Sequence, residues 1–383
     1  MKLNYFINLK LTIMKRLNLI LSVAILTVAV LFQSCQKNEL EPIDQNKNIL
    51  PERFKVDIPN SISGTSYYKS TNVDTLQGND IYEHMRTFIW IGEQAGDIVS
   101  EIIYVIGLHN LSQPMSFSYT SDDDGRVKNV VIIENSEFEG VVWEYQMTIT
   151  DDGSDAISGN ENTAMQIFWN KSPIKGIAIL NPYNIDRTTD PEFIDTRYRI
   201  DYSEAGELGY EKHMIVSIAG LPLENPLDDP YSMEIMKMFV GKNGDAVSVY
   251  GNSDHPNATF FNGDVGFDWA FTAAGKQSTD IGVAEVGLPG NTLNSTDRYT
   301  LLVENSIKNV FTEQIYEVWP GIDSTSVNSY LYNTDAPGFF DHGGFVQGGT
   351  APGPQYNSLL NIIAGLTPYN PAVVNELEIL FKE

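Results

Sequence analysis

Cysteine is almost missing from this 383-residue sequence, which contains it once, as Cys35. A chain with one cysteine cannot form an internal disulfide, so packing alone must stabilise its folded part. The chain is 42% hydrophobic, and its length suits one large domain or two ordinary ones. A substantial hydrophobic core is therefore expected.

Basic residues are scarce as well, with 24 Lys and Arg against 50 Asp and Glu. The first 34 residues hold four of the basic residues and no acidic one, so a chain beginning at Cys35 would carry 20 basic and 50 acidic residues, a net charge of −30. Such a surface repels phosphate backbones and anionic lipids, which makes nucleic acid an unfavourable partner.

Motifs that mark catalytic or metal sites are absent too. The sequence has no G-x-S-x-G, no Gly-Lys-Ser/Thr step, no H-x-x-x-H spacing and no EF-hand loop. We predict no catalytic residue, no metal site and no cofactor, and a non-enzymatic protein is favoured over an enzyme. The five histidines are isolated in sequence: His84, His109, His213, His255 and His342.

The stretch from Met14 to Cys35 has the features of an export signal. Lys15 and Arg16 precede an apolar run, Leu17 to Phe32, interrupted only by three small or polar residues. This run is shorter than the roughly 20 residues that a membrane-spanning helix needs. A charged start, a short apolar run and a small residue before the break are typical of a secretory signal peptide, here residues 1–34.

The end of this signal, Leu31-Phe32-Gln33-Ser34-Cys35, resembles the lipobox of bacterial lipoproteins, although Phe32 stands where that family has leucine. The resemblance implies that Cys35 is diacylated, becomes the first mature residue and anchors the chain in a membrane. Gln36-Lys37-Asn38-Glu39-Leu40-Glu41 resembles the export tag of Bacteroidetes surface lipoproteins. Together they imply an outer-membrane protein exposed at the cell surface, with residues 35–50 as a lipidated flexible tether.

Hydrophobic periodicity predicts a helix over about 80–108, followed by strands. The helix has an apolar arc of over half its circumference, while Glu83, Arg86, Glu93 and Asp97 are expected on the opposite, polar side. Gly92 and Gly96 fall on the apolar face and would allow close packing. Period-two strands are predicted near 54–58, 115–121, 126–134, 140–150, 163–170, 174–181, 196–203, 210–219, 245–251, 258–262, 266–274, 279–286, 298–304, 312–318 and 377–381.

Short turns between these strands predict an antiparallel meander. The expected fold class is α+β and mostly antiparallel β, a curved sheet or half-barrel meander packed around one long N-terminal helix. A Pro-containing break near 221–229 divides residues 51–225 from a second β-rich region, 226–383, which is either continuous with the first or separate. A second helix is predicted from Asp229 to a stop at Gly241.

Several side chains are candidate ligand contacts. Phe267, Trp269 and Phe271 occupy alternate positions and share one face of a predicted strand, where they form either the aromatic core of a sheet or a platform for stacking sugars. Asp254 and His255 are adjacent and form the most interesting acid–base pair. His342 and Phe345 lie in the glycine-rich run 341–349, which is expected to be a mobile surface loop, one that could cover a ligand cleft.

Two short matches concern modification. Asp74-Thr75-Leu76 and Asp323-Ser324-Thr325 resemble the O-glycosylation site of exported Bacteroidetes proteins. This resemblance implies that Thr75 and Ser324 carry glycans.

These observations lead to three hypotheses. The leading one is a non-catalytic surface lipoprotein, held by the lipid on Cys35, that binds or scaffolds a partner such as a glycan or another surface protein. The second is a carrier that holds an apolar ligand between the half-barrel and the helix, which requires a hollow cup. The third is a glycan-binding or glycan-degrading partner of a polysaccharide-uptake system, which requires exposed, coplanar aromatic rings.

Overall fold

The structure is a computed structural model of the chain. It describes residues 49–65, 76–107, 111–152, 162–225, 229, 231–260 and 266–383. The predicted signal peptide and most of the tether lie outside the described residues, as do Cys35, Thr75 and His109.

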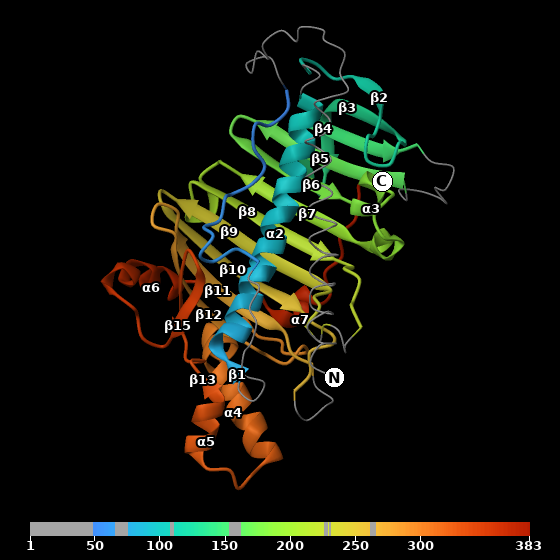
Figure 1. Cartoon of the computed structure of the whole chain (residues 1–383). Coiled ribbons are helices and arrows are strands. Elements are labelled where there is room, and N and C mark those ends of the chain that lie inside the picture. Colours follow the sequence, from blue (N-terminus) through green and yellow to red (C-terminus); the bar gives the residue numbers. More distant parts are fainter. Residues whose placement is uncertain are drawn as a thin grey trace.

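Within these residues, thirteen strands form one open, curved sheet in the order β15-β14-β12-β11-β10-β9-β8-β7-β6-β5-β4-β3-β2 (Figure 1). Neighbouring strands pair antiparallel and most follow each other directly in sequence, which confirms the predicted antiparallel architecture. The strands are β2 (Ser116–Thr120), β3 (Val127–Phe138), β4 (Val141–Asp151), β5 (Thr163–Lys171), β6 (Ile174–Leu180), β7 (Arg197–Ser203), β8 (Lys212–Ala219), β9 (Ile235–Asn243), β10 (Ala246–Asp254), β11 (Trp269–Lys276), β12 (Ile281–Gly287), β14 (Gly338–Asp341) and β15 (Gly344–Gly348).

The sheet runs through both predicted regions, because β8 pairs with β9 across the Pro-containing segment. Outside the sheet, β1 (Leu76–Gln77) pairs in parallel with β13 (Leu331–Tyr332). The helices are α2 (Gly78–Gly107), α3 (Pro182–Ile185), α4 (Ile307–Val318), α5 (Ser324–Tyr330), α6 (Asn357–Ile363) and α7 (Pro371–Val374), with shorter helical turns at η2 (Pro191–Asp195), η3 (Glu207–Gly209), η4 (Thr300–Glu304) and η5 (Pro354–Tyr356).

Helix α2 lies diagonally across one face of the sheet (Figure 1). An added Cβ at Gly92 would lie 2.5 Å from the Met238 Cε and 2.9 Å from the Met236 Cε, so this glycine lets the helix approach β9 closely. The apolar side of the helix is at most 4% exposed and consists of Ile81, Met85, Phe88, Ile89, Ala95, Val99, Ile103 and Ile106.

The predicted polar side of α2 is not open to solvent along its length, which corrects the expectation from sequence. Arg86 is 5% exposed and Glu83 is 8% exposed. Arg86 donates to Glu83 Oε2 and to the Asn60 carbonyl, both at 2.6 Å, and the Phe345 N–H donates to Glu83 Oε1 at 2.6 Å. Residues from both ends of the chain therefore cover this side of the helix.

One of these covering segments is the stretch around residues 54–58, which was predicted as a strand. It is extended but does not join the sheet; it runs beside α2 instead. Lys55 forms an ion pair with Asp97, and the Ile58 N–H donates to Glu93 Oε1 at 3.0 Å. The period-two pattern reflects burial of alternate side chains rather than strand pairing. Phe54 packs on Tyr202 of β7, with ring centroids 5.5 Å apart, whereas Lys55 turns toward the helix.

Three further element predictions are wrong. The segment predicted as a helix up to Gly241 forms strand β9, because Met236, Met238 and Val240 alternate and are fully buried, while the backbone pairs with β8 and β10. Conversely, residues predicted as strands near 298–304 and 312–318 form the helical turn η4 and helix α4.

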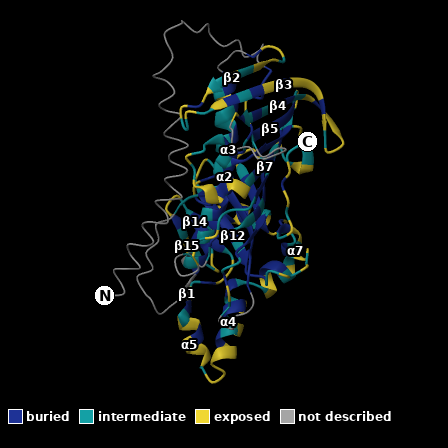
Figure 2. Cartoon of the chain, turned by 90° about the vertical axis from the view of Figure 1, so that its right-hand side faces the viewer, coloured by how far each residue is buried: buried dark blue, intermediate teal, exposed yellow. Residues whose placement is uncertain are grey.

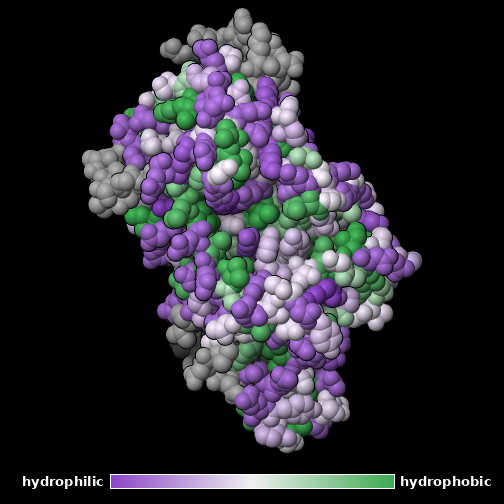
Figure 3. Space-filling model, turned by 180° about the vertical axis from the view of Figure 1, so that it is seen from behind, coloured by the Kyte–Doolittle hydropathy of each residue, from purple (hydrophilic) through white to green (hydrophobic). Residues whose placement is uncertain are grey.

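The face of the sheet opposite α2 is covered by α6, α7 and the C-terminal segment. Leu377, Ile379 and Phe381 pack against Trp143 and Phe168. The predicted closing strand is not formed there. Instead, the Gln166 amide donates to the Lys382 carbonyl at 3.1 Å and accepts from its N–H at 2.7 Å. In the view from behind, hydrophobic side chains interrupt the hydrophilic surface in separate places (Figure 3).

Candidate functional site

Trp269 and Phe271 do not form a platform for sugars. Both side chains are fully buried in the main core, under α2, so their faces cannot stack on an incoming ring. The core alternative is the one the structure confirms. Trp269 packs edge-to-face on Phe88 of the helix, with ring centroids 5.4 Å apart.

The predicted pair of Asp254 and His255 is split between the two faces of the sheet. His255 turns toward α2, where its ring lies 4.5 Å from that of Phe88. Its Nδ1 lies 2.9 Å from the Tyr231 carbonyl and its Nε2 lies 2.7 Å from Ser253 Oγ. Since a carbonyl only accepts, Nδ1 carries the proton and Nε2 accepts from the Ser253 hydroxyl.

This Ser253–His255 chain has the polarity of a nucleophile and its base, but both residues are at most 1% exposed. Burial lowers the pKa of His255 to about 3, so the ring stays neutral. No carboxylate accepts from Nδ1, and a substrate could not reach Ser253 without opening the core. The chain of hydrogen bonds is therefore structural.

The glycine-rich run is an ordered hairpin, β14–β15, rather than the expected mobile loop. Phe345 stacks on Tyr82 with ring centroids 5.0 Å apart, so it anchors the hairpin on α2. His342 lies at the turn, with its side chain 85% exposed and its Nδ1 4.0 Å from Asp341 Oδ1. The structure thus separates His342 from the Ser253–His255 pair.

The acidic turn near residue 124 leads into a buried ion network. Lys128 Nζ donates to Asp124 Oδ2 at 2.8 Å, to Asp151 Oδ1 at 2.9 Å and to the Asn184 carbonyl at 3.0 Å. Arg126 and Arg187 also donate to Asp151. The lysine thereby uses all three of its donors, and these carboxylates already have cationic partners.

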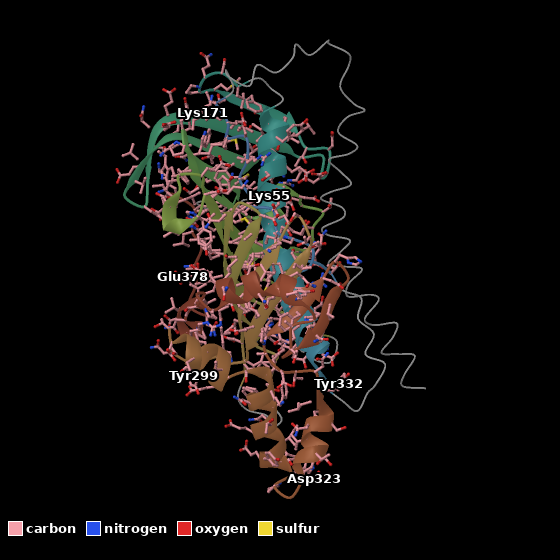
Figure 4. The ribbon with its side chains drawn as sticks, turned by 90° about the vertical axis from the view of Figure 1, so that its left-hand side faces the viewer. Lys55, Lys171, Tyr299, Asp323, Tyr332 and Glu378 are labelled. Carbon is pink, nitrogen blue, oxygen red and sulfur yellow. The ribbon has the colours of Figure 1, made fainter. Side chains whose placement is uncertain are left out.

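An open cleft lies near the C-terminal end of α4, a segment that was predicted as a strand. Helices α4 and α5 form a hairpin that projects from one end of the sheet, with Asp323 at its tip (Figures 1 and 4). Buried anchors, including Phe311, Ile315 and Val327, join the hairpin to the main core. Asp323 caps α5 by accepting from the Thr325 and Ser326 N–H groups at 3.0 and 3.1 Å.

Between the two helices is an open cleft of about 990 Å³. Trp319, which follows the last residue of α4, borders it and is 53% exposed. The hairpin tip near α5 is one of the places with the yellow, exposed colour in Figure 2. The cleft is lined by Ile315, Val318, Trp319, Pro320, Gly321, Ile322, Thr325, Ser326, Val327, Ser329 and Tyr330.

Ser324, the candidate for O-glycosylation, is exposed in the first turn of α5, beside this cleft. The adjoining Asp323 is engaged as the helix cap. The sequence signals that could have located the hairpin are the helical spacing of Ile307, Val310, Phe311 and Ile315, followed by Pro-Gly and by an Asp-Ser-Thr cap.

A second polar cluster lies on the face of the sheet away from α2. Asp254 follows Ser253 and Asp268 precedes its partner Trp269, so in this antiparallel pair the two aspartates stand opposite each other, at the end of β10 and just before β11. Their side chains therefore point to the same face of the sheet from neighbouring positions. Burial and the nearby Asp254 carboxylate raise the pKa of Asp268 to about 8, and burial also raises the pKa of Asp254.

Comparisons of the chain with protein-family models, with curated proteins and with solved structures found no match. Among the helices of the described residues, none has the length and hydrophobicity that crossing a membrane requires.

Proposed function

We propose that this protein is a non-catalytic binding module, anchored by the lipid on Cys35 at the outer-membrane surface, and that it contacts its ligand through the α4–α5 cleft. The observation that carries this proposal is the open cleft beside the exposed Trp319. Large aromatic side chains at such openings supply much of the energy of recognition.

The chemistry of the cleft favours a neutral glycan as the ligand. An exposed indole offers a flat apolar face to a sugar ring, and the hydroxyl groups of Thr325 and Ser329 can exchange hydrogen bonds with sugar hydroxyls. The Ser326 hydroxyl donates to Asp323 Oδ2 at 2.7 Å and can still accept. The net charge of −26 disfavours acidic ligands. In this proposal, the curved sheet packed around the N-terminal helix is a half-barrel that supports the hairpin.

Two observations weigh against the other hypotheses. A carrier needs a hollow beside α2, but the side chains facing it, including Met214, Met236, Met238 and Val240, are fully buried and in contact with the core. A hydrolase needs accessible catalytic groups, and the Ser253–His255 pair is buried.

The test of ligand binding is a glycan array probed with the fluorescently labelled full chain in detergent. We expect Trp319→Ala to weaken binding to any recognised neutral glycan by roughly 30-fold, which corresponds to about 2 kcal/mol. Tyr104→Ala is the matched control, because Tyr104 is 58% exposed on α2, away from the hairpin. Equal binding by the wild type and Trp319→Ala would contradict the proposal.

The test of anchoring is independent. Protease treatment of intact cells should digest the wild-type protein, and Cys35→Ser should leave the membrane fraction because it lacks the lipid. A wild-type protein that resists protease in intact cells but is cut after lysis would place it on the periplasmic side.

A further inference from the structure

The back-face cluster formed by Asn252, Asp254, Asp268, Thr272 and Asn375 has more buried polar atoms than partners. Asn252 and Asp254 are alternate residues of β10 and so point to the same face. Asn252 is opposite Ala270, whose small side chain separates Asp268 from Thr272. The side chains of Asn252, Asp268, Ala270 and Thr272 are all fully buried.

The cover of this cluster comes from the other end of the described chain. Asn375, directly after α7, donates from its amide nitrogen to Asp268 Oδ2 at 3.2 Å and to the Asn291 carbonyl at 2.9 Å. Its amide oxygen is thereby left on the side of the cluster without a donor. The site thus combines two neighbouring strands with a segment more than 100 residues later.

Five polar atoms here are buried and have no hydrogen-bond partner within the described residues, and four of them are oxygens: Asp268 Oδ1, Asn252 Oδ1, Thr272 Oγ1, Asn375 Oδ1 and Asn252 Nδ2. An unpartnered buried polar atom costs roughly 1–3 kcal/mol. The two carboxyl groups also have no ion pair with any described Lys, Arg or His. Oxygen atoms outnumber the donors in this cluster and no described cation faces them, which favours a positive ligand.

We propose that this cluster is a calcium site, with the Asp254 and Asp268 carboxylates and the amide oxygens of Asn252 and Asn375 as its protein ligands. Ca²⁺ accepts six to eight oxygen ligands in flexible geometry, including carboxylates, amide carbonyls and water. Mg²⁺ requires a stricter octahedron and retains more of its water, so it fits four protein oxygens from three segments less well. Two carboxylates match the charge of one Ca²⁺, and binding requires both to be deprotonated.

The consequence is a cation that fastens α7 and the C-terminal segment to the middle of the sheet. Asp254 is 9% exposed, which provides a route of entry at the edge of the cluster. This inference does not depend on the α4–α5 cleft, because that hairpin contributes none of the proposed ligands.

The test uses the full chain in detergent, dialysed against metal-free buffer and then against 1 mM CaCl2 or 1 mM MgCl2. Inductively coupled plasma mass spectrometry should find about one Ca²⁺ per chain, and the melting temperature should rise more with Ca²⁺ than with Mg²⁺. Asp268→Asn should abolish both effects. Asp122→Asn, which removes an exposed carboxylate from the acidic turn, should leave both unchanged.

A second variant keeps the test decisive if Asp268→Asn does not fold. Asn252→Ala removes a neutral ligand and retains both carboxylates. It should weaken Ca²⁺ binding at least about tenfold, because even the loss of a residue that only hydrogen-bonds to a metal ligand has an effect of that size. The proposal is overturned if the wild type holds no Ca²⁺ after dialysis and shows no thermal shift, or if these variants bind Ca²⁺ as the wild type does.

Discussion

Two buried clusters of charge lie at different places on the same sheet and are built in opposite ways. Around Lys128, three cationic side chains surround Asp151 and Asp124, and the lysine has three acceptors. Around Asp268, two carboxyl groups face each other with an amide as the only donor side chain among the described residues. The first cluster is complete within the protein, whereas the second is complete only with a proton or a cation.

The two clusters also respond to pH in opposite directions. Burial alone would raise the pKa of Asp151, but hydrogen bonds from Arg126 and Lys128 outweigh it and hold the pKa below its ordinary value. The stability from Asp151 is therefore lost as the pH falls. Asp268, whose pKa is raised, loses its stabilising contribution as the pH rises. The pH dependence that a buried carboxylate gives to stability therefore depends on its partners and not on its burial alone.

The largest expected effect is that of breaking the complete cluster. Lys128→Met keeps the length of the side chain but leaves Asp151, which is fully buried, with less compensation. We expect a loss of about 3–5 kcal/mol in the free energy of unfolding, measured by urea denaturation. Lys175→Ala is the control, because its ion pair with Glu207 is about 40% exposed on both sides and should cost at most about 1 kcal/mol. Similar losses of unfolding free energy in both variants would show that the buried network stabilises the fold no more than an exposed ion pair does.

The next effect concerns the incomplete cluster, measured in EDTA to exclude metal. The folded chain holds the Asp268 proton more tightly than the unfolded chain, whose aspartates have a pKa of about 3.9. The contribution of Asp268 is therefore full below that pH and is lost as the pH rises through about 8. Between pH 5 and pH 8, wild-type stability should fall by at most about 1.4 kcal/mol per pH unit from this group.

Asp268→Asn imitates the protonated form, so its unfolding free energy should change less with pH over this window. Asp122→Asn should keep the wild-type slope, because that carboxylate is exposed. An equal slope for the wild type and Asp268→Asn would mean that Asp268 is ionised in the folded chain.

A smaller loss of stability is expected at the Ser253–His255 pair, which is neutral and whose ring nitrogens both have hydrogen-bond partners. Ser253→Ala removes the only donor to His255 Nε2 among the described residues, and an unpartnered buried nitrogen costs roughly 1–3 kcal/mol. Ser278→Ala is the control, because its hydrogen bond to Asp245 is exposed. Urea denaturation of both variants measures the difference. If Ser253→Ala is no less stable than the control, the hydrogen bond from Ser253 does not stabilise the core.

Sequence alone predicted the antiparallel sheet well, because its hairpins are local. The strands near 126–134 and 140–150, for example, are joined by a short turn and pair as β3 and β4. The same reasoning failed where side-chain preferences conflict with the fold. Methionines suggested a helix in β9, and the Val, Ile and aromatic residues of α4 suggested a strand.

Neither candidate site could be predicted from the sequence, because each depends on structure that the sequence patterns did not indicate. The cleft depends on α4 being helical, and the Asp254–Asp268 pair depends on a register between two strands and on Asn375, which lies 107 residues beyond Asp268. Asp254 and His255 are adjacent in sequence and were predicted as a pair, but successive residues of a strand point to opposite faces of the sheet, which separates them.

The smallest effect on stability is expected at the cleft, where binding rather than folding should depend on the side chain. Trp319→Ala should change the free energy of unfolding by no more than about 0.5 kcal/mol, because half of this side chain already contacts solvent. Ile315→Ala, on the buried side of the same helix and 3% exposed, should cost about 2–5 kcal/mol. If urea denaturation gave similar losses for both variants, Trp319 would be part of the structural core of the hairpin, and its effect on glycan binding could no longer be separated from folding.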